Sequence, residues 1–320
     1  MRFKRFVPLF LALPLIFGAV ARAQDQDEEG VRGAFLSSRP SAGAGASAGL
    51  SSSSGGNAGA GVNVSTGRRS RRRSNAGKST AKVTATTNKN TSGTSKSTTT
   101  TSNTNVAVKA VASAPIGLGY TLYMRDANGD AVRVDPARDF RTGERVRLSM
   151  ETSADSYLYI FNSTDNGDPV MIYPDVRLDD AGNYIEAHMP TEIPSSTEAD
   201  ERLRWFAFDA TPGIEHLYIV VSRDPLPGIP IEDALVSYCR SNRCPWRPAP
   251  GVWAQIKAAM NGRVQVVKSK TYGQAQTAGE REATTRGLGL DQSAPPPSVI
   301  RMNVSSDTGI LVTSIDLAHR

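Results

Sequence analysis

Apolar and polar residues alternate along short stretches of the second half of this chain, with turn residues between them. Residues 120–125 (YTLYMR) and 131–135 (AVRVD) flank the sequence DANGD, and an Asn-Gly pair in that position is typical of a β-hairpin. The same alternation predicts further strands at 145–151, 156–162, 169–173, 184–187, 203–209 and 216–222. Their spacing favours a mainly β domain, an antiparallel sandwich or a barrel-like fold.

The period changes to a helical one near residue 229. Apolar residues at helical spacing in 231–238 and 252–260 predict two short helices. We therefore expect, in order, a helical insertion at about 229–262, a strand at 263–268, a loose segment at about 271–297 and a C-terminal hairpin at 298–317. Residues 113–320 are long enough to form one core, so we predict a single β-rich domain.

Cys239 and Cys244 are the two cysteines of the chain, and both lie in the helical insertion. In an oxidising compartment we expect them to form a disulfide; two free thiols are the alternative. A zinc site needs more ligands than two cysteines, and the three histidines lie far away in sequence. No metal or other cofactor is expected.

The N-terminus has the order of a secretory signal. Three basic residues within the first five precede an uncharged apolar run over 6–20, and Ala21-Arg22-Ala23 follows. The run is shorter than the roughly 20 residues of a membrane span. We predict a cleaved signal peptide at 1–23, an uncleaved anchor being the alternative, and hence a periplasmic or extracellular protein without a transmembrane segment in its mature form.

Residues 24–112 are rich in Ser, Thr, Gly, Ala and Asn, and Phe35 is their single aromatic residue. Such a composition buries too little apolar surface to offset the entropy of ordering, so we predict a disordered, low-complexity tract. Its formal charge is +8. With four positive charges in residues 1–23 and +6 overall, residues 113–320 carry −6, so the folded part is acidic.

Five arginines are clustered within this tract: Arg68, Arg69, Arg71, Arg72 and Arg73. A flexible basic arm attracts polyanions in a salt-sensitive way. Blocks of like charge are also commonly extended, solvated spacers, and this second interpretation stays open.

Candidate chemistry in the predicted domain is sparse. Asp126, Asn128 and Asp130 have the alternating oxygens of a calcium loop, but the glycine is misplaced for an EF-hand, which favours a plain turn. No Gly-x-Ser-x-Gly elbow occurs, and we expect His188 and His216 to be surface or strand histidines without a catalytic partner. The sequence therefore shows no catalytic constellation.

Trp246 is the clearest candidate for a binding residue. It lies beside Arg247 and between prolines in the loop after the cysteines, and exposed Trp and Arg side chains are frequent interface hot spots. The alternative is that Trp246 is a buried plug at one end of the domain.

Residues 120–226 resemble the domain of unknown function 4384 family. The resemblance is carried by Phe140 with GERVRL, by SYLYIFN at 156–162, by Ile172-Tyr173-Pro174 and, further on, by PGIE and SRDPL. It implies a β-rich accessory module of exported proteins and assigns no activity. We therefore expect an exported, non-enzymatic interaction module of the cell envelope or extracellular space, with a protein or envelope polymer as partner. The alternative is a secreted hydrolase with an unrecognised site.

Overall fold

The computed structural model describes residues 20–41, 114–165, 167–177, 182–241, 244–260, 262–304 and 309–320. The body of the predicted signal peptide and the arginine cluster at 68–73 lie outside these residues, as does the rest of the low-complexity tract from residue 42 to residue 113. Within the described residues, no helix is both long and apolar enough to cross a membrane.

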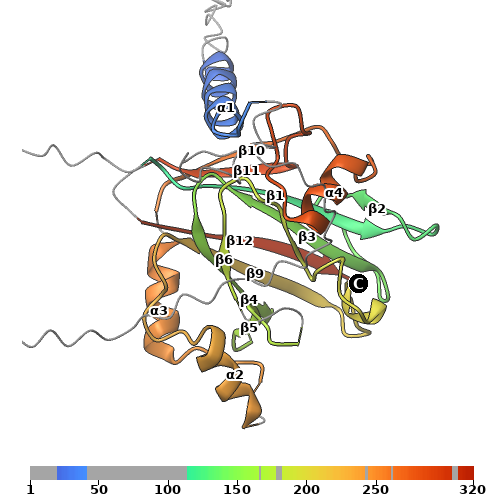
Figure 1. Ribbon diagram of the computed structural model, residues 1–320, viewed down its shortest axis with the longest axis vertical. Helices are drawn as coiled ribbons and strands as arrows, with labels where there is room; N and C mark the ends of the chain where they lie inside the picture. The colour runs from blue at the N-terminus through green and yellow to red at the C-terminus, as the bar shows by residue number, and fades with distance from the viewer. Residues whose placement is uncertain are drawn as a thin grey trace, which may run out of the picture. The chain divides into compact units, whose positions relative to one another are not determined.

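Two antiparallel sheets face each other, which confirms the predicted sandwich (Figure 1). The seven-stranded sheet has the order β10-β11-β1-β3-β7, with β2 beside β1 and β8 beside β3. Its strands are β1 (Gly117–Arg125), β2 (Ala131–Arg133), β3 (Arg145–Thr152), β7 (Thr191–Ile193), β8 (Phe206–Ala207), β10 (Val264–Lys268) and β11 (Val299–Asn303). The five-stranded sheet has the order β12-β9-β4-β5, with β6 beside β4. Its strands are β4 (Ser156–Thr164), β5 (Val170–Tyr173), β6 (Tyr184–Ile185), β9 (Gly213–Ser222) and β12 (Ile310–His319).

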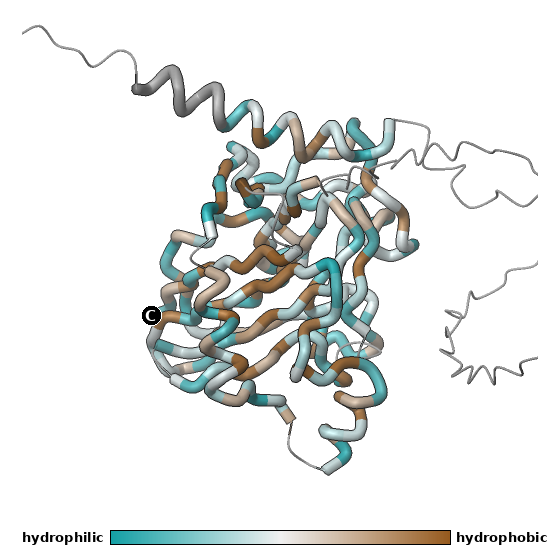
Figure 2. Tube along the Cα trace, turned by 90° about the vertical axis from the view of Figure 1, so that its left-hand side faces the viewer, coloured by the Kyte–Doolittle hydropathy of each residue, from teal (hydrophilic) through white to brown (hydrophobic). Residues whose placement is uncertain are grey.

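The main core lies between the sheets and is built by alternate residues of neighbouring strands. Leu118 and Leu122 of β1 face Leu158 and Ile160 of β4, and all four are buried. The hydropathy colouring shows apolar segments running through the interior of the domain (Figure 2). The period of two that predicted the strands therefore also selects the face that is buried.

β4 is buried on both faces, as its continuous apolar run predicts. Its other face carries Tyr159 and Phe161, which form a second core with the helical insertion. The insertion consists of α2 (Glu232–Arg240) and α3 (Pro250–Ala259), and the Cys239–Cys244 disulfide links the end of α2 to the loop that leads to α3. The predicted helices and disulfide are thus confirmed, and they cover the outer face of the five-stranded sheet.

Three local predictions are wrong. The segment expected to be loose contains α4 (Ala278–Arg286), which begins with a capping box between Thr277 and Glu280. The expected C-terminal hairpin does not form, since β11 pairs with β1 and β10 whereas β12 pairs with β9 in the other sheet. Only β8 and a 3-10 turn, η2 (Glu201–Leu203), form in the strand predicted at 203–209.

The N-terminal tract is ordered at its start, which corrects the predicted disorder for this part. Helix α1 (Val20–Ser37) spans the predicted cleavage point and packs against β10 and β11 of the seven-stranded sheet. Val31 and Phe35, four positions apart, are buried together with Val267 and Ile300 of these strands. Two apolar residues on one face of α1 are sufficient to dock the helix, because the sheet offers a complementary surface. The composition of the tract does not show such a surface.

Candidate functional site

The outer face of the seven-stranded sheet carries charged residues along β3. Because Leu118 and Leu148 point inward, the alternate residues of β1 and β3 point outward. On β3 these outward residues are Arg145, Arg147, Ser149 and Glu151. This face has three parts: an open end at Arg145, a middle part covered by α4, and an end at Glu151 covered by α1.

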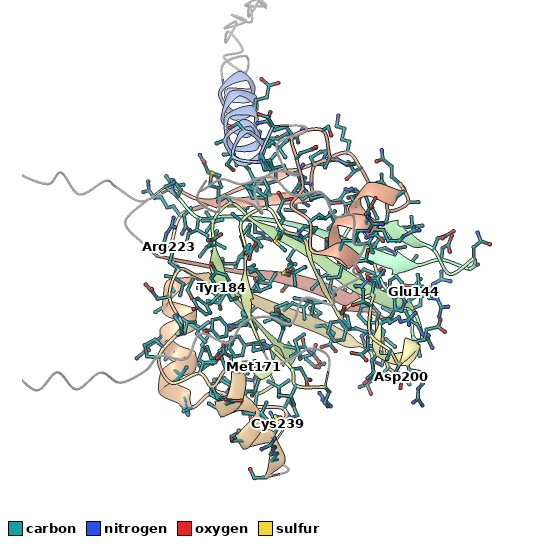
Figure 3. All side chains as sticks on the ribbon, viewed as in Figure 1. Glu144, Met171, Tyr184, Asp200, Arg223 and Cys239 are labelled. Carbon is teal, nitrogen blue, oxygen red and sulfur yellow. A yellow bond between two sulfur atoms is a disulfide. The ribbon has the colours of Figure 1, made fainter. Side chains whose placement is uncertain are left out.

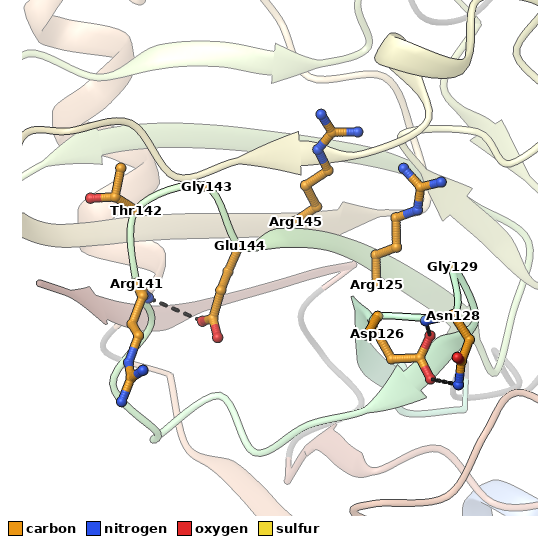
Figure 4. Close-up of a pocket in the computed structure, with 10 residues that line it drawn as sticks. Arg125, Asp126, Asn128, Gly129, Arg141, Thr142, Gly143, Glu144 and Arg145 are labelled. Carbon is orange, nitrogen blue, oxygen red and sulfur yellow. Dashed lines mark hydrogen bonds between the residues drawn. The ribbon is translucent and has the colours of Figure 1, made fainter.

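At the open end lies the arginine hollow, a cavity of about 610 Å³ that opens widely to solvent. It lies between the β1–β2 turn and the turn that precedes β3 (Figure 4). Its lining residues are Arg125, Asp126, Ala127, Asn128, Gly129, Arg141, Thr142, Gly143, Glu144 and Arg145. Glu144 marks this end of the sandwich, far from Cys239 in the helical insertion (Figure 3).

Local hydrogen bonds and one glycine fix the β1–β2 turn. Asp126 Oδ1 accepts hydrogen bonds from the backbone amides of Asn128 (2.9 Å) and Asp130 (2.7 Å), and Gly129 supplies the positive φ that the turn needs. The carboxylate proposed as a calcium ligand is therefore engaged by its own loop, which supports the plain hairpin turn.

The arginines of the hollow differ in their partners. The Arg125 guanidinium lies 2.9 Å from the Glu201 carboxylate in an exposed pair. Arg145 is exposed and has no acidic partner among the residues that the structure describes. Arg125 and Arg145 extend toward the same side of the hollow, whereas Arg141 extends to the other (Figure 4). Glu144 does not neutralise Arg145, because its carboxylate bonds to Arg138 and to the Arg141 amide.

The middle of this face is a buried polar network beneath α4. The Arg147 guanidinium stacks 4.2 Å from the Trp205 ring and lies 3.5 Å from Glu192. Burial lowers the pKa of Arg147 despite this carboxylate. Tyr123 donates to Glu280, and burial, reinforced by that carboxylate, raises the pKa of Tyr123 well above its usual value.

The covered end contains a cluster that sequence reasoning missed. Arg39, just after α1, donates from Nε (2.8 Å) and Nη2 (2.7 Å) to the two oxygens of Glu151. His188 Nδ1 lies 2.7 Å from Glu151 Oε1, and His188 Nε2 lies 2.9 Å from Ser38 Oγ. His188 is 3% exposed, so the prediction of a surface or strand histidine is wrong. The four members of the cluster come from three distant parts of the chain, Ser38-Arg39, Glu151 and His188, so no local motif predicts the cluster.

Glu151 is the centre of this cluster. Burial alone would raise the pKa of its carboxyl group, but hydrogen bonds from Arg39 and His188 outweigh burial and hold the pKa below the usual value. Glu151 is therefore an anion that accepts from an arginine and a histidine in a closed environment.

Trp246 is not presented to solvent. It is 9% exposed and belongs to the second core, with its ring centroid 6.4 Å from that of Phe161. Its carbonyl oxygen accepts from the Met171 amide at 2.8 Å, which ties the loop to β5. The hot-spot hypothesis is therefore wrong for Trp246. The side chain is buried, as in the plug alternative, but it packs between the helical insertion and the outer face of the five-stranded sheet. The neighbouring Arg247 is exposed.

His216, the other histidine considered, lies on β9 as expected for a strand residue. Its Nδ1 is 2.8 Å from Asp316 of β12, opposite it in the sheet. Among the described residues, no group of three or more histidine, cysteine or acidic side chains is placed to hold a metal ion.

Comparison with known proteins identifies one region. Residues 139–225 match the model of a family described as "Domain of unknown function (DUF4384)", so the chain carries a domain of this family there. The match includes β3 to β9, and with them one wall of the arginine hollow, Glu151 and His188. No curated protein and no solved structure matches the chain.

Proposed function

We propose that this chain is an exported binding module that takes an anionic group of its partner, a carboxylate or a phosphate, in the arginine hollow. One observation carries the proposal: Arg145 is exposed and without an acidic partner in the described structure, beside Arg125 in an open cavity. The partner would be a protein or a polymer of the cell envelope or extracellular space, as the N-terminal signal pattern suggests.

Arginine chemistry supports this assignment. A guanidinium group is planar and permanently charged, and it binds carboxylate and phosphate oxygens with two parallel hydrogen bonds. Arg125 can exchange its present partner for a ligand, since its pair with Glu201 is exposed and such pairs contribute about 0–1 kcal/mol. An open hollow suits a group that projects from a large partner better than a small molecule that must be enclosed.

The test is a titration of the full chain with inorganic phosphate and with an acetylated tetraglutamate peptide, followed by NMR of the arginine Nε–H groups. We expect the Arg145 and Arg125 signals to shift and Arg145→Gln to weaken binding by about tenfold or more, the value of a lost charge-assisted hydrogen bond. Arg141→Gln is the matched control, because Arg141 lines the same hollow but points away. Equal losses in both variants, or no shift at Arg145, would contradict the proposal.

A hydrolase is the second candidate, and the covered end of the sheet favours it. Ser38, His188 and Glu151 form a nucleophile–base–carboxylate chain with contacts of 2.9 Å and 2.7 Å. Three features count against it. Ser38 Oγ donates to the Phe35 carbonyl at 2.7 Å, Arg39 already binds the Glu151 carboxylate, and Ser38 follows the C-terminal end of α1, where the helix dipole disfavours an anion.

A fluorophosphonate probe separates the two candidates. Such a probe labels activated serines, so a binding module should remain unlabelled, while a hydrolase should be labelled and lose the label in Ser38→Ala. Labelling at Ser38 would replace the proposed function by the second candidate.

A further inference from the structure

Residues 28–41, which we call the clasp segment, are held by a groove in the rest of the domain. The Phe35 ring is fully buried against β1, where Gly117 and Gly119 leave space for it. A Cβ atom at Gly117 would lie 2.8 Å from Phe35 Cδ2, and one at Gly119 would lie 2.9 Å from Phe35 Cζ. Two glycines on one face of a strand thus form a slot for one aromatic ring.

Arg39, four residues after Phe35, is the second anchor. Besides its two bonds to Glu151, its Nη1 donates to the Ala294 carbonyl at 2.9 Å, and the residue is 2% exposed. A bidentate, charge-assisted pair of this kind selects arginine over lysine. The groove is therefore specific for a segment in which an arginine follows an aromatic residue by four positions.

Polar contacts at the rim fix the direction of the clasp segment. The backbone amide of Gln292 donates to the Pro40 carbonyl, and its side-chain Nε2 donates to the Arg39 carbonyl, both at 3.1 Å. His188 contacts Ser38 and meets the Phe35 ring edge to face. We call Gly117, Gly119, Glu151, His188 and Gln292 the clasp groove. All of its residues belong to residues 114–320, and the clasp segment is joined to them only through residues 42–113.

We propose that the clasp groove is an interaction site for a second copy of this chain, whose clasp segment docks in place of the chain's own. The contacts described above would be the same in both arrangements, because each of them lies between residues 28–41 and residues 114–320. The connection favours docking within one copy, since an intramolecular partner has an effective concentration of up to about the millimolar range. Exchange between copies becomes measurable when docking within each copy is disabled.

Two full-length variants provide the test. The first carries Phe35→Ala, so that its groove is intact and its segment cannot fill the slot. The second carries Gly119→Ala and Glu151→Gln, so that its segment is intact and its groove is defective. Sedimentation velocity of each variant alone should show monomers, and the mixture should show a one-to-one complex.

Variants of the second copy supply the controls. Adding Arg39→Ala should weaken the mixed complex by about tenfold or more, as expected for a charge-assisted pair. Adding Arg32→Ala should change it by less than about threefold, because the hydrogen bond that Arg32 donates to the Lys268 carbonyl is exposed to solvent. If the second copy is unfolded by circular dichroism, a synthetic peptide of residues 24–41 replaces it and should bind the first copy.

The mixture of the first variant with the second variant, or with the peptide, decides the proposal. A folded pair that forms no complex would overturn it, and so would a complex that is insensitive to Arg39→Ala. Because the arginine hollow remains intact in all of these variants, phosphate binding there serves as an independent readout of the proposed function.

Discussion

Arg39 and Glu151, separated by more than a hundred residues in sequence, form a buried two-bond ion pair that joins the end of α1 to β3. Both side chains are nearly inaccessible, so removing either partner would leave a charge without compensation in a closed environment. The pair therefore makes the attachment of the clasp segment sensitive to the charge of one carboxyl group.

The first prediction follows from the lowered pKa of Glu151. A carboxyl group with a depressed pKa in the folded state stabilises that state above its unfolded pKa of about 4.3, and this contribution is lost as the pH falls through the folded value. Between about pH 6 and about pH 3, the free energy of unfolding in urea should fall more steeply in the wild type than in Glu151→Gln. Equal slopes in the two proteins would show that the contacts of Arg39 and His188 with Glu151 do not stabilise the fold through the charge of this carboxylate.

The second prediction concerns Gly119. Its missing Cβ would lie 2.6 Å from Pro297 Cγ and 2.9 Å from the Phe35 ring, so Gly119→Ala should destabilise the domain by about 1–3 kcal/mol through overpacking. Gly279→Ala, in α4, is the matched control, because nothing lies within 4 Å of its added carbon. The control should be neutral or stabilising by up to about 1 kcal/mol. Urea denaturation of both variants measures the contrast, and similar effects would argue against the slot.

The third prediction distinguishes packing from recognition at Trp246, in the loop that follows the disulfide. Trp246→Ala should cost about 3–5 kcal/mol of stability, because it empties part of the second core beside Phe161. Arg247→Ala, one residue on and exposed, should change stability by no more than about 0.5 kcal/mol. A thermally silent Trp246→Ala would restore the interpretation of this tryptophan as a binding residue.

The fourth prediction addresses the arginine cluster of the low-complexity tract. Changing Arg68, Arg69, Arg71, Arg72 and Arg73 to glutamine should lower the salt concentration that elutes the chain from heparin resin, because each lost phosphate- or sulfate-like contact reduces the salt dependence. The matched variant changes five lysines instead: Lys78, Lys82, Lys89, Lys96 and Lys109. Unchanged elution of the arginine variant would contradict this prediction and would support the interpretation of the tract as a solvated spacer.

Local pattern predicted most of the strands, and for a physical reason. Alternation in 145–152 and the apolar run in 156–164 report burial by neighbouring strands, which any sandwich provides. The capping box of Thr277 and Glu280 was also readable in the sequence, so α4 could have been predicted from Thr-x-x-Glu. What local pattern cannot report is which sheet a strand joins, and this is why β11 and β12 were wrongly paired.

The burial of the charged residues on the outward face of β3 could not be predicted from the sequence, for a related reason. Alternation places Arg147 and Glu151 on the outward face of β3, where charged residues ordinarily meet solvent. They are buried because α4 and α1 cover this face, and those helices come from distant parts of the chain. The serine and histidine beside Glu151 likewise become neighbours only after folding, so spacing in sequence carried no signal for them.

Docking of the clasp segment also changes the topology of the chain. The domain holds the chain at residues 28–41 and again at β1, which begins at Gly117, so the arc of chain between these two attachments closes a noncovalent ring. A single proteolytic cut in that arc would open the ring without separating the pieces, because Phe35 and Arg39 would still hold the N-terminal fragment. A nicked chain should therefore migrate as one particle in native buffer and as two bands only after denaturation.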